Sequence, residues 1–364
     1  MRRRDLLAGL SFVPLAVPAV AQCVGPTFRR INLPNRCEGD AGGIALDFLA
    51  PGSLDPRITL TRASTGTYFD SVGVMQTAAI NAPRWDYDPA TLALRGLLLE
   101  GQRTNGVRNS TMVGTVPGSP GTPPTNWGFG GSPAVTPQMV GIGTENGIPY
   151  VDMRFAGTTI NSNTQILPEV GAGVMVAANG QAWSSSVYVR LVAGTLSGFN
   201  YVQLFTNETT AAGAQVKSNS GPAILATSIP TASLATQRNV YSVTLTGGGT
   251  VAAVQVRWLI NTGVGVPIDF TLRFGAPQLE LGDFATSYIP TSTVAVTRSP
   301  EIMTASVPTG TYATETVGGT VNVAGVTYAG TASSAAGVLT FAWPAAAVTA
   351  GERHLRRLTL RQTG

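Results

Sequence analysis

Aromatic residues in polar, glycine-rich surroundings are the first residues of this chain that could bind a ligand. Trp127 and Phe129 stand in a Gly/Pro/Thr-rich stretch, where a tryptophan has no obvious core to enter. Tyr201 stands close to Asn200 and Gln203 at the expected start of a strand. Aromatic faces stack on the apolar side of a sugar ring, while nearby amides bind its hydroxyl groups. We therefore expect these five residues to contact sugar, with Trp127 and Phe129 as the leading candidates.

Catalytic patterns are scarce. The single histidine, His354, argues against a Ser-His-Asp triad, and no G-x-S-x-G, H-E-x-x-H, Walker A or EF-hand pattern occurs. A glycosidase needs two carboxylates roughly 5–10 Å apart in a cleft. The sequence leaves two such pairs open, Asp70 with Glu100 and Asp86 with Asp88. Because the chain has only 19 acidic residues, many of them at turns, we expect no enzymatic activity.

Cofactors and nucleic acid are not indicated either. Calcium could be held by carboxylates such as Glu280 and Asp283, but no metal-ligand spacing occurs, so no cofactor is expected. The net charge of +4 comes from arginines near the two ends, and Lys217 is the only lysine between them. A phosphate-binding surface needs clustered basic residues in the folded body. We therefore expect no nucleic-acid partner.

The N-terminus has the features of an export signal. Arg2–Arg4 precede a short apolar run that ends in Ala19-Val20-Ala21. This pattern describes a secretory signal of the twin-arginine type, and an anchor peptide that docks a fibre to its particle has the same character. The run is too short and too interrupted by proline to span a membrane. Cys23 and Cys37 either close a small loop or remain two thiols.

Alternating apolar and polar residues predict long strands. Segments 183–191, 254–261 and 268–274 each place apolar side chains on one side and polar side chains on the other. A period of two with one apolar face is what a two-sheet sandwich requires, because successive side chains point to opposite faces. Trp183 and Trp258 fall on the apolar faces, which favours packing in the core. Several such strands between Gly-rich turns predict a jelly-roll-like sandwich.

The composition also predicts an all-β protein. The 364-residue chain contains 43 Gly, 24 Pro and only 12% charged residues, a mixture that suits short strands joined by tight turns. The changes in composition along the chain predict five regions: a signal-like or anchor leader with a short helix (1–22), a linker (23–44), an N-terminal β unit (45–110), a β-sandwich (111–303) and a small C-terminal β region (304–364).

Two segments carry a resemblance to a known family. The first includes Leu54-Asp55-Pro56-Arg57, Ala82-Pro83-Arg84-Trp85-Asp86-Tyr87-Asp88-Pro89, Arg95-Gly96-Leu97-Leu98-Leu99-Glu100 and Gln102-Arg103-Thr104-Asn105. The second includes Pro277-Gln278-Leu279-Glu280-Leu281-Gly282, Ala285-Thr286-Ser287-Tyr288-Ile289-Pro290-Thr291 and Val296-Thr297-Arg298. Together, over roughly residues 45–303, they resemble the phage head spike fibre domain family of phages, prophages and gene transfer agents. The signal-like leader departs from that pattern.

The resemblance implies a β-sandwich related to carbohydrate-binding modules, displayed on a virion and contacting cell-surface polysaccharide. It also implies that Trp85, which lies in the first segment, is packed. From the residues themselves, we expect the alternating charges of the first segment to join loops through ion pairs rather than to bind ligand. They are Arg57, Arg62, Arg84, Arg103, Asp55, Asp70, Asp86, Asp88 and Glu100.

The sequence thus predicts a non-catalytic spike or fibre on a virion surface or exported from the cell. We expect it to be a homo-oligomer that binds cell-surface polysaccharide and contacts other virion proteins. Three alternatives remain open from the residues. They are a secreted bacterial carbohydrate-binding protein of prophage origin, a polysaccharide depolymerase, and a purely structural decoration protein.

Overall fold

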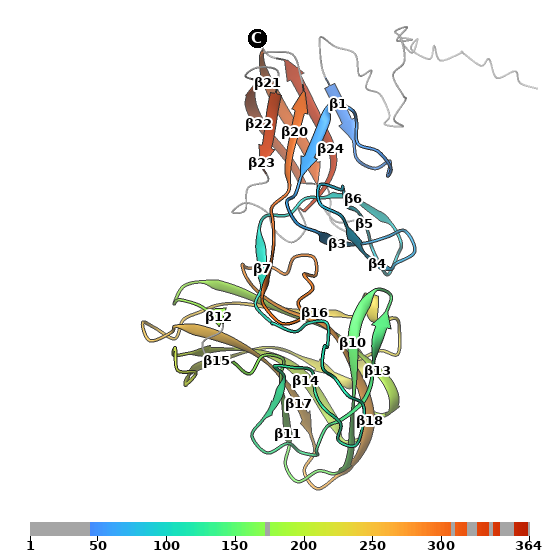
Figure 1. Ribbon diagram of the computed structural model, residues 1–364, viewed down its shortest axis with the longest axis vertical. Coiled ribbons are helices and arrows are strands. Elements are labelled where there is room, and N and C mark those ends of the chain that lie inside the picture. Colours follow the sequence, from blue (N-terminus) through green and yellow to red (C-terminus); the bar gives the residue numbers. More distant parts are fainter. Residues whose placement is uncertain are drawn as a thin grey trace, which may run out of the picture.

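The computed structural model describes residues 44–171, 175–306, 310–318, 326–334, 338–342 and 353–362. The predicted leader, the two cysteines and the linker up to residue 43 lie outside the described residues. The described chain is built almost wholly of antiparallel strands, as the composition predicted, with two short 3₁₀ turns at Ala226–Ser228 and Leu234–Thr236. Figure 1 shows two β units, one above the other.

The lower unit in Figure 1 is a sandwich of two sheets. Sheet I has the strand order β16-β13-β18-β10-β9, and sheet II has the order β15-β14-β17-β11-β8, with β12 also paired to β17. The strands of sheet I are β9 (Gln138–Glu145), β10 (Ile148–Thr158), β13 (Ala182–Thr195), β16 (Arg238–Thr244) and β18 (Pro267–Leu281). The strands of sheet II are β8 (Gly128–Gly130), β11 (Asn163–Leu167), β12 (Met175–Val176), β14 (Phe199–Thr209), β15 (Gln215–Leu225) and β17 (Ala253–Thr262).

The connections make this sandwich a jelly roll. Leaving out the edge strands β8 and β9 and the short β12, the chain runs β10, β11, β13, β14, β15, β16, β17 and β18. It passes from one sheet to the other at every step except between β14 and β15. In chain order the two sheets therefore read 1-8-3-6 and 2-7-4-5, the arrangement of an eight-stranded jelly roll. The jelly-roll prediction is confirmed.

The core of the sandwich follows the predicted alternation. Trp183 is 7% exposed and Trp258 is fully buried. Trp258 stacks on Phe274 of the opposite sheet, with ring centroids 5.1 Å apart. Apolar burial of this kind is the main favourable contribution to folding, and aromatic side chains supply the largest areas. The prediction that both tryptophans are core residues is confirmed.

The upper unit combines both ends of the described chain. β24 (His354–Gln362) lies between β21 (Gly310–Gly318) and β6 (Leu94–Leu98), and also pairs with β1 (Ile44–Asp47). The other strands are β2 (Ile58–Thr61), β3 (Gly66–Phe69), β4 (Met75–Ala78), β5 (Trp85–Tyr87), β20 (Ile302–Ser306), β22 (Val326–Ser334) and β23 (Val338–Ala342). Among them, β2 pairs with β20, β20 with β23, and β22 with β21.

The division of this unit into two separate regions, 45–110 and 304–364, was therefore wrong. Leu46, Trp85 and Leu97 from the first region share one buried core with Met303 and Leu358 from the second. The two regions are neighbours in space because their strands pair with each other, a relation that composition does not reveal. The expectation that Trp85 is packed is confirmed, since it is 9% exposed.

A short two-stranded ribbon lies between the two units. β7 (Arg103–Asn105) leads down into the sandwich, and β19 (Val296–Arg298) returns beside it. The ribbon places Glu100, just before β7, beside Ser287, which follows β18, and Glu100 belongs to a cluster of buried charged residues. Within the described residues, no helix is long and apolar enough to cross a membrane.

Candidate functional site

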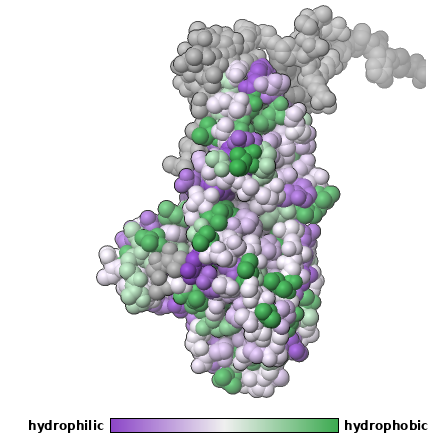
Figure 2. Space-filling view, viewed as in Figure 1, coloured by the Kyte–Doolittle hydropathy of each residue, from purple (hydrophilic) through white to green (hydrophobic). Residues whose placement is uncertain are grey.

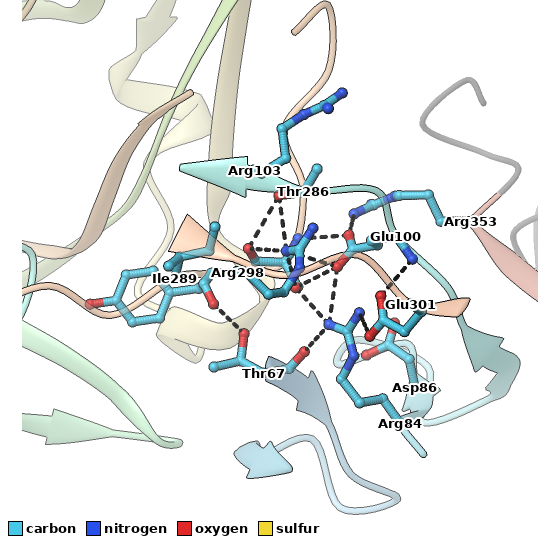
Figure 3. Close-up of polar contacts among 12 residues, drawn as sticks. Thr67, Arg84, Asp86, Glu100, Arg103, Thr286, Ile289, Arg298, Glu301 and Arg353 are labelled. Carbon is cyan, nitrogen blue, oxygen red and sulfur yellow. Dashed lines mark hydrogen bonds and ion pairs between the residues drawn. The ribbon is translucent and has the colours of Figure 1, made fainter. Parts of the chain in front are cut away.

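The two segments that carry the family resemblance meet in a buried polar junction between the units (Figure 3). Glu100, which follows β6, is the centre of this junction. Its carboxylate lies 3.0 Å from both Arg84 and Arg298 and 2.5 Å from Arg353. It also accepts hydrogen bonds from the backbone N–H and the hydroxyl group of Ser287, at 2.8 and 2.6 Å. One carboxylate thus contacts Arg84 of the first segment, Ser287 and Arg298 of the second, and Arg353 near the end of the described chain.

A second buried carboxylate extends this junction. Glu301 lies 2.9 Å from Arg62 and 2.5 Å from Arg84, and it accepts a 2.8 Å hydrogen bond from the backbone N–H of Glu100. The side chains of Arg62, Arg84, Glu100 and Glu301 are 0% exposed. Burial alone would raise the pKa of Glu100, but the surrounding arginines, Arg298 first, hold that pKa well below its usual value. The carboxylate is therefore ionised and inaccessible to a ligand.

The junction is structural, as the charges of the first segment predicted. Arg62 also donates to the carbonyl oxygens of Ser64, Ala79 and Ala82, so it holds the β2–β5 loops in place. Outside the junction, Arg57 makes a bidentate pair with Asp55 at the surface. Replacing one member of a buried charge cluster leaves the others uncompensated, which strongly destabilises the fold.

The carboxylate pairs considered for glycan hydrolysis are all occupied by structural contacts. Asp70 accepts backbone hydrogen bonds from Val72 and Val74 within its own turn. Asp88 accepts hydrogen bonds from the backbone N–H groups of Ala90 and Thr91 in the next turn. Asp86 accepts a hydrogen bond from the backbone N–H of Phe69.

The pKa values of these carboxylates also argue against a role as a general acid. Burial would raise the pKa values of Asp70, Asp86 and Asp88, but hydrogen bonds and nearby positive groups outweigh it and lower all three. The pKa of Glu100 is lowered as well. A general acid requires the opposite shift.

The only histidine is also buried. The Nε2 atom of His354 lies 2.8 Å from a carboxylate oxygen of Asp86. Burial lowers the pKa of His354, an effect that outweighs the opposite effect of its hydrogen bond to the Asp86 carboxylate. The pair connects β24 to β5 inside the upper unit, and it is not accessible to substrate.

The leading aromatic candidates, Trp127 and Phe129, pack against the sandwich core, so the expectation that their loop has no core to enter was wrong. Trp127 is 6% exposed, donates a 2.8 Å hydrogen bond to the carbonyl oxygen of Asn109, and meets Trp258 edge to face. Phe129 is half-buried and packs against the same core, because its position in β8 pairs with Ile166 on the core side of β11. The loop folds back over the sandwich and inserts its aromatic residue into the core.

The second set of candidates does lie on an accessible surface. Tyr201 and Gln203 on β14 alternate with the buried residues Val202 and Leu204, so their side chains point away from the core. Both are partly exposed, and Asn200 at the strand start is exposed. Gln203 donates to the carbonyl oxygen of Gly221 at 2.6 Å, which fixes its amide against β15. These three residues belong to the face of sheet II that is turned to solvent.

Strand pairing adds residues that the sequence alone did not connect with Tyr201. On β17, Asn261 lies opposite Tyr201, Leu259 opposite Gln203, and Arg257 opposite Phe205. The outer face of sheet II includes the residues Asn163, Gln165, Leu167, Asn200, Tyr201, Gln203, Phe205, Ser218, Ser220, Ala223, Leu225, Gln255, Arg257, Leu259 and Asn261. The alternation in segment 254–261 marked Gln255, Arg257 and Asn261 as one side of a strand, but only the register shows their neighbours.

Amide side chains connect the strands of this face. Asn200 donates to Asn261, which donates to Asn163, both at 2.8 Å. β8 contributes only Gly128 and Gly130 beside the outer face, so no side chain from this edge strand covers the neighbouring β11. The result is a surface of aromatic rings and amides, the side-chain types that bind sugar rings and hydroxyl groups.

Two other kinds of site, a surface pocket and a metal site, have weaker support. An open pocket beside β9 and β10 is lined by residues 131–136, Gln138, Ala156–Thr158 and Ile160, and none of these is charged. Among the described residues, no group of three His, Cys, Asp or Glu side chains could hold a metal ion. Glu280, named above as a calcium candidate with Asp283, instead accepts hydrogen bonds from Gln278 and Thr286.

No protein-family model matches the chain, and no curated protein matches its sequence.

Proposed function

We propose that this chain is a non-catalytic, polysaccharide-binding surface protein, and that it binds through the outer face of sheet II. The observation that carries the proposal is the side-chain set of this face. Tyr201 and Phe205 are partly exposed on one side of β14, with Gln203 between them and amides on the adjacent β17 and β11. With a rise of about 3.3 Å per residue, the two aromatic residues stand roughly 13 Å apart along the strand. This spacing suits a short stretch of a sugar chain.

The jelly-roll sandwich supports such a role because its sheet faces are rigid. Strands position side chains more accurately than loops do, and lectin domains are among the proteins that use this architecture. On the side of the molecule seen in Figure 2, apolar residues form small separate clusters, as on an ordinary protein surface. A single shallow face binds sugar weakly. A homo-oligomer would convert several weak contacts into useful avidity.

The display context proposed is a spike or fibre of a phage or phage-like particle, or an exported protein of the same origin. Its support is the resemblance carried by the two segments, which pack together at the junction around Glu100. Contact with other virion proteins belongs to the same proposal. The lowered pKa values of the acidic residues considered for hydrolysis support a binding role over a catalytic one.

The test is binding of the full chain to a glycan array and to polysaccharides of candidate host cells. Tyr201→Ala should weaken binding about tenfold or more, because a stacked ring contributes on the order of 1.4 kcal/mol. The matched control is Tyr150→Ala on the outer face of sheet I, where the ring of Tyr150 lies 3.4 Å from the guanidinium of Arg273. Equal losses in both variants, or no binding to any glycan, would contradict the proposal.

A further inference from the structure

The outer face of sheet II contains one charged side chain, Arg257. It projects from the middle of β17, between Gln255 and Leu259, and is partly exposed. Its neighbours across the strands are Phe205 on β14 and Gln165 on β11. All other outward-pointing residues of this face are neutral, and the charges that border it beside Gln255 form the Arg108–Glu169 ion pair.

The guanidinium of Arg257 is held in place by neutral groups. Its Nε and Nη2 atoms donate to the amide oxygen of Gln255 at 3.1 and 3.0 Å, and its Nη1 atom donates to the amide oxygen of Gln165 at 3.2 Å. An arginine has five N–H donors, so two remain for a ligand. Burial lowers the pKa of Arg257, and no carboxylate of the described residues lies within ion-pair distance to offset it. The charge is therefore fixed in position and not neutralised.

The other side of the sandwich shows how unusual this arrangement is. On the outer face of sheet I, Arg154 pairs with Asp269 at 2.8 Å, Arg190 pairs with Glu145 at 3.0 Å, and Arg273 contacts both Asp152 and Glu145. Arg238 of the same sheet has no carboxylate partner in this set, but it donates to the carbonyl oxygen of Thr286. On sheet I most arginines are thus paired with carboxylates. On sheet II, Arg257 is held in place without a carboxylate partner beside the ring of Phe205.

We propose that the ligand of this face is an acidic polysaccharide, and that Arg257 binds the carboxylate of a uronic or sialic acid unit. The inference rests on the proposed function and specifies its substrate class. Adjacent strands are about 4.8 Å apart, so a sugar ring stacked on Phe205 brings its substituents within reach of Arg257. The planar guanidinium matches the two oxygens of a carboxylate, and Gln165 and Gln255 hold it in the required orientation.

The experiment compares the full chain with its Arg257→Gln and Arg257→Lys variants. Probes are immobilised polygalacturonate, polysialic acid and the carboxyl-reduced form of each, and the readout is biolayer interferometry at several salt concentrations. Arg154→Gln is the matched control, because it removes the same charge from the exposed outer face of sheet I. Thermal unfolding of each variant shows whether the fold is retained.

The expected result is preferential binding to at least one acidic polymer, reduced about tenfold or more by Arg257→Gln and unchanged by Arg154→Gln. Arg257→Lys should restore only part of the affinity, since an ammonium group cannot form the planar pair. Equal binding to the acidic and reduced polymers, or equal losses in Arg257→Gln and Arg154→Gln, would overturn the inference. Tyr201-dependent binding to neutral glycans alone would overturn it while leaving the proposed function intact. Binding to no glycan would overturn both.

Discussion

Replacing Glu100 with glutamine tests how much the buried junction contributes to stability. The substitution keeps the size of the side chain and removes its negative charge. In the native protein, this charge compensates Arg84 and Arg298, which are almost completely buried, and Arg353 beside them. The new amide would direct donor hydrogens at guanidinium groups that are themselves only donors. Three arginines would then share a buried environment with one fewer counter-charge.

The expected cost is about 3–5 kcal/mol in the free energy of unfolding, the range found when one partner of a buried ion pair is removed. The matched control is Asp55→Asn, which removes a carboxylate from the surface pair with Arg57. Those two side chains are 32% and 44% exposed, so the control should cost about 0–1 kcal/mol. Urea unfolding followed by tryptophan fluorescence would give both values under the same conditions.

The pH dependence gives a second measure of the same junction. Because the pKa of Glu100 is lowered on folding, its contribution to stability is present above its unfolded pKa and is lost as the pH falls towards its folded value. The wild-type protein should lose stability with acid below about pH 4.5, and Glu100→Gln should show a smaller loss over that range. A Glu100→Gln protein as stable as the Asp55→Asn control would refute the assigned role of the junction.

Three further predictions concern other parts of the chain. Trp127→Ala should lower the free energy of unfolding in urea by about 3–5 kcal/mol, because it empties a core site, whereas Tyr201→Ala on the outer face should lower it by less than about 1 kcal/mol. Equal costs would contradict the placement of Trp127 in the core and of Tyr201 at the surface. Because burial lowers the pKa of His354, the protein should lose stability as the pH falls below about 6.5, and His354→Gln should remove that loss in thermal unfolding. Gly96→Ala should destabilise the upper unit by more than about 1 kcal/mol, because Gly96 has a positive φ and an added Cβ would lie 2.6 Å from the carbonyl oxygen of Leu355. An unchanged unfolding midpoint would contradict this prediction.

The sandwich could be predicted from sequence because its signal is local. Alternation within segments 183–191, 254–261 and 268–274 defines which side of each strand faces the core, and the structure buries that side. The upper unit could not be predicted, since β24 pairs with strands more than 200 residues earlier. Nothing within either segment indicates such a partner.

The binding face was accessible to sequence reasoning only in part. The residue types around Tyr201 indicate it, but the Gly/Pro-rich stretch around Trp127 predicts a surface loop and makes Trp127 the stronger candidate from sequence alone. Composition does not say whether a loop folds back onto a core, and here the hydrogen bond from Trp127 to Asn109 fixes it inside. Arg257 was visible as the polar side of a strand, yet its place beside Phe205 depends on a register that no local pattern encodes.

The most direct test of the proposed function is hydrogen–deuterium exchange of the full chain with and without a bound polysaccharide identified on the array. Binding through the outer face of sheet II predicts slower exchange in β14, β17 and β11 and no change in β9 and β10 of sheet I. Protection confined to sheet I or to the upper unit would contradict the assignment of the binding face.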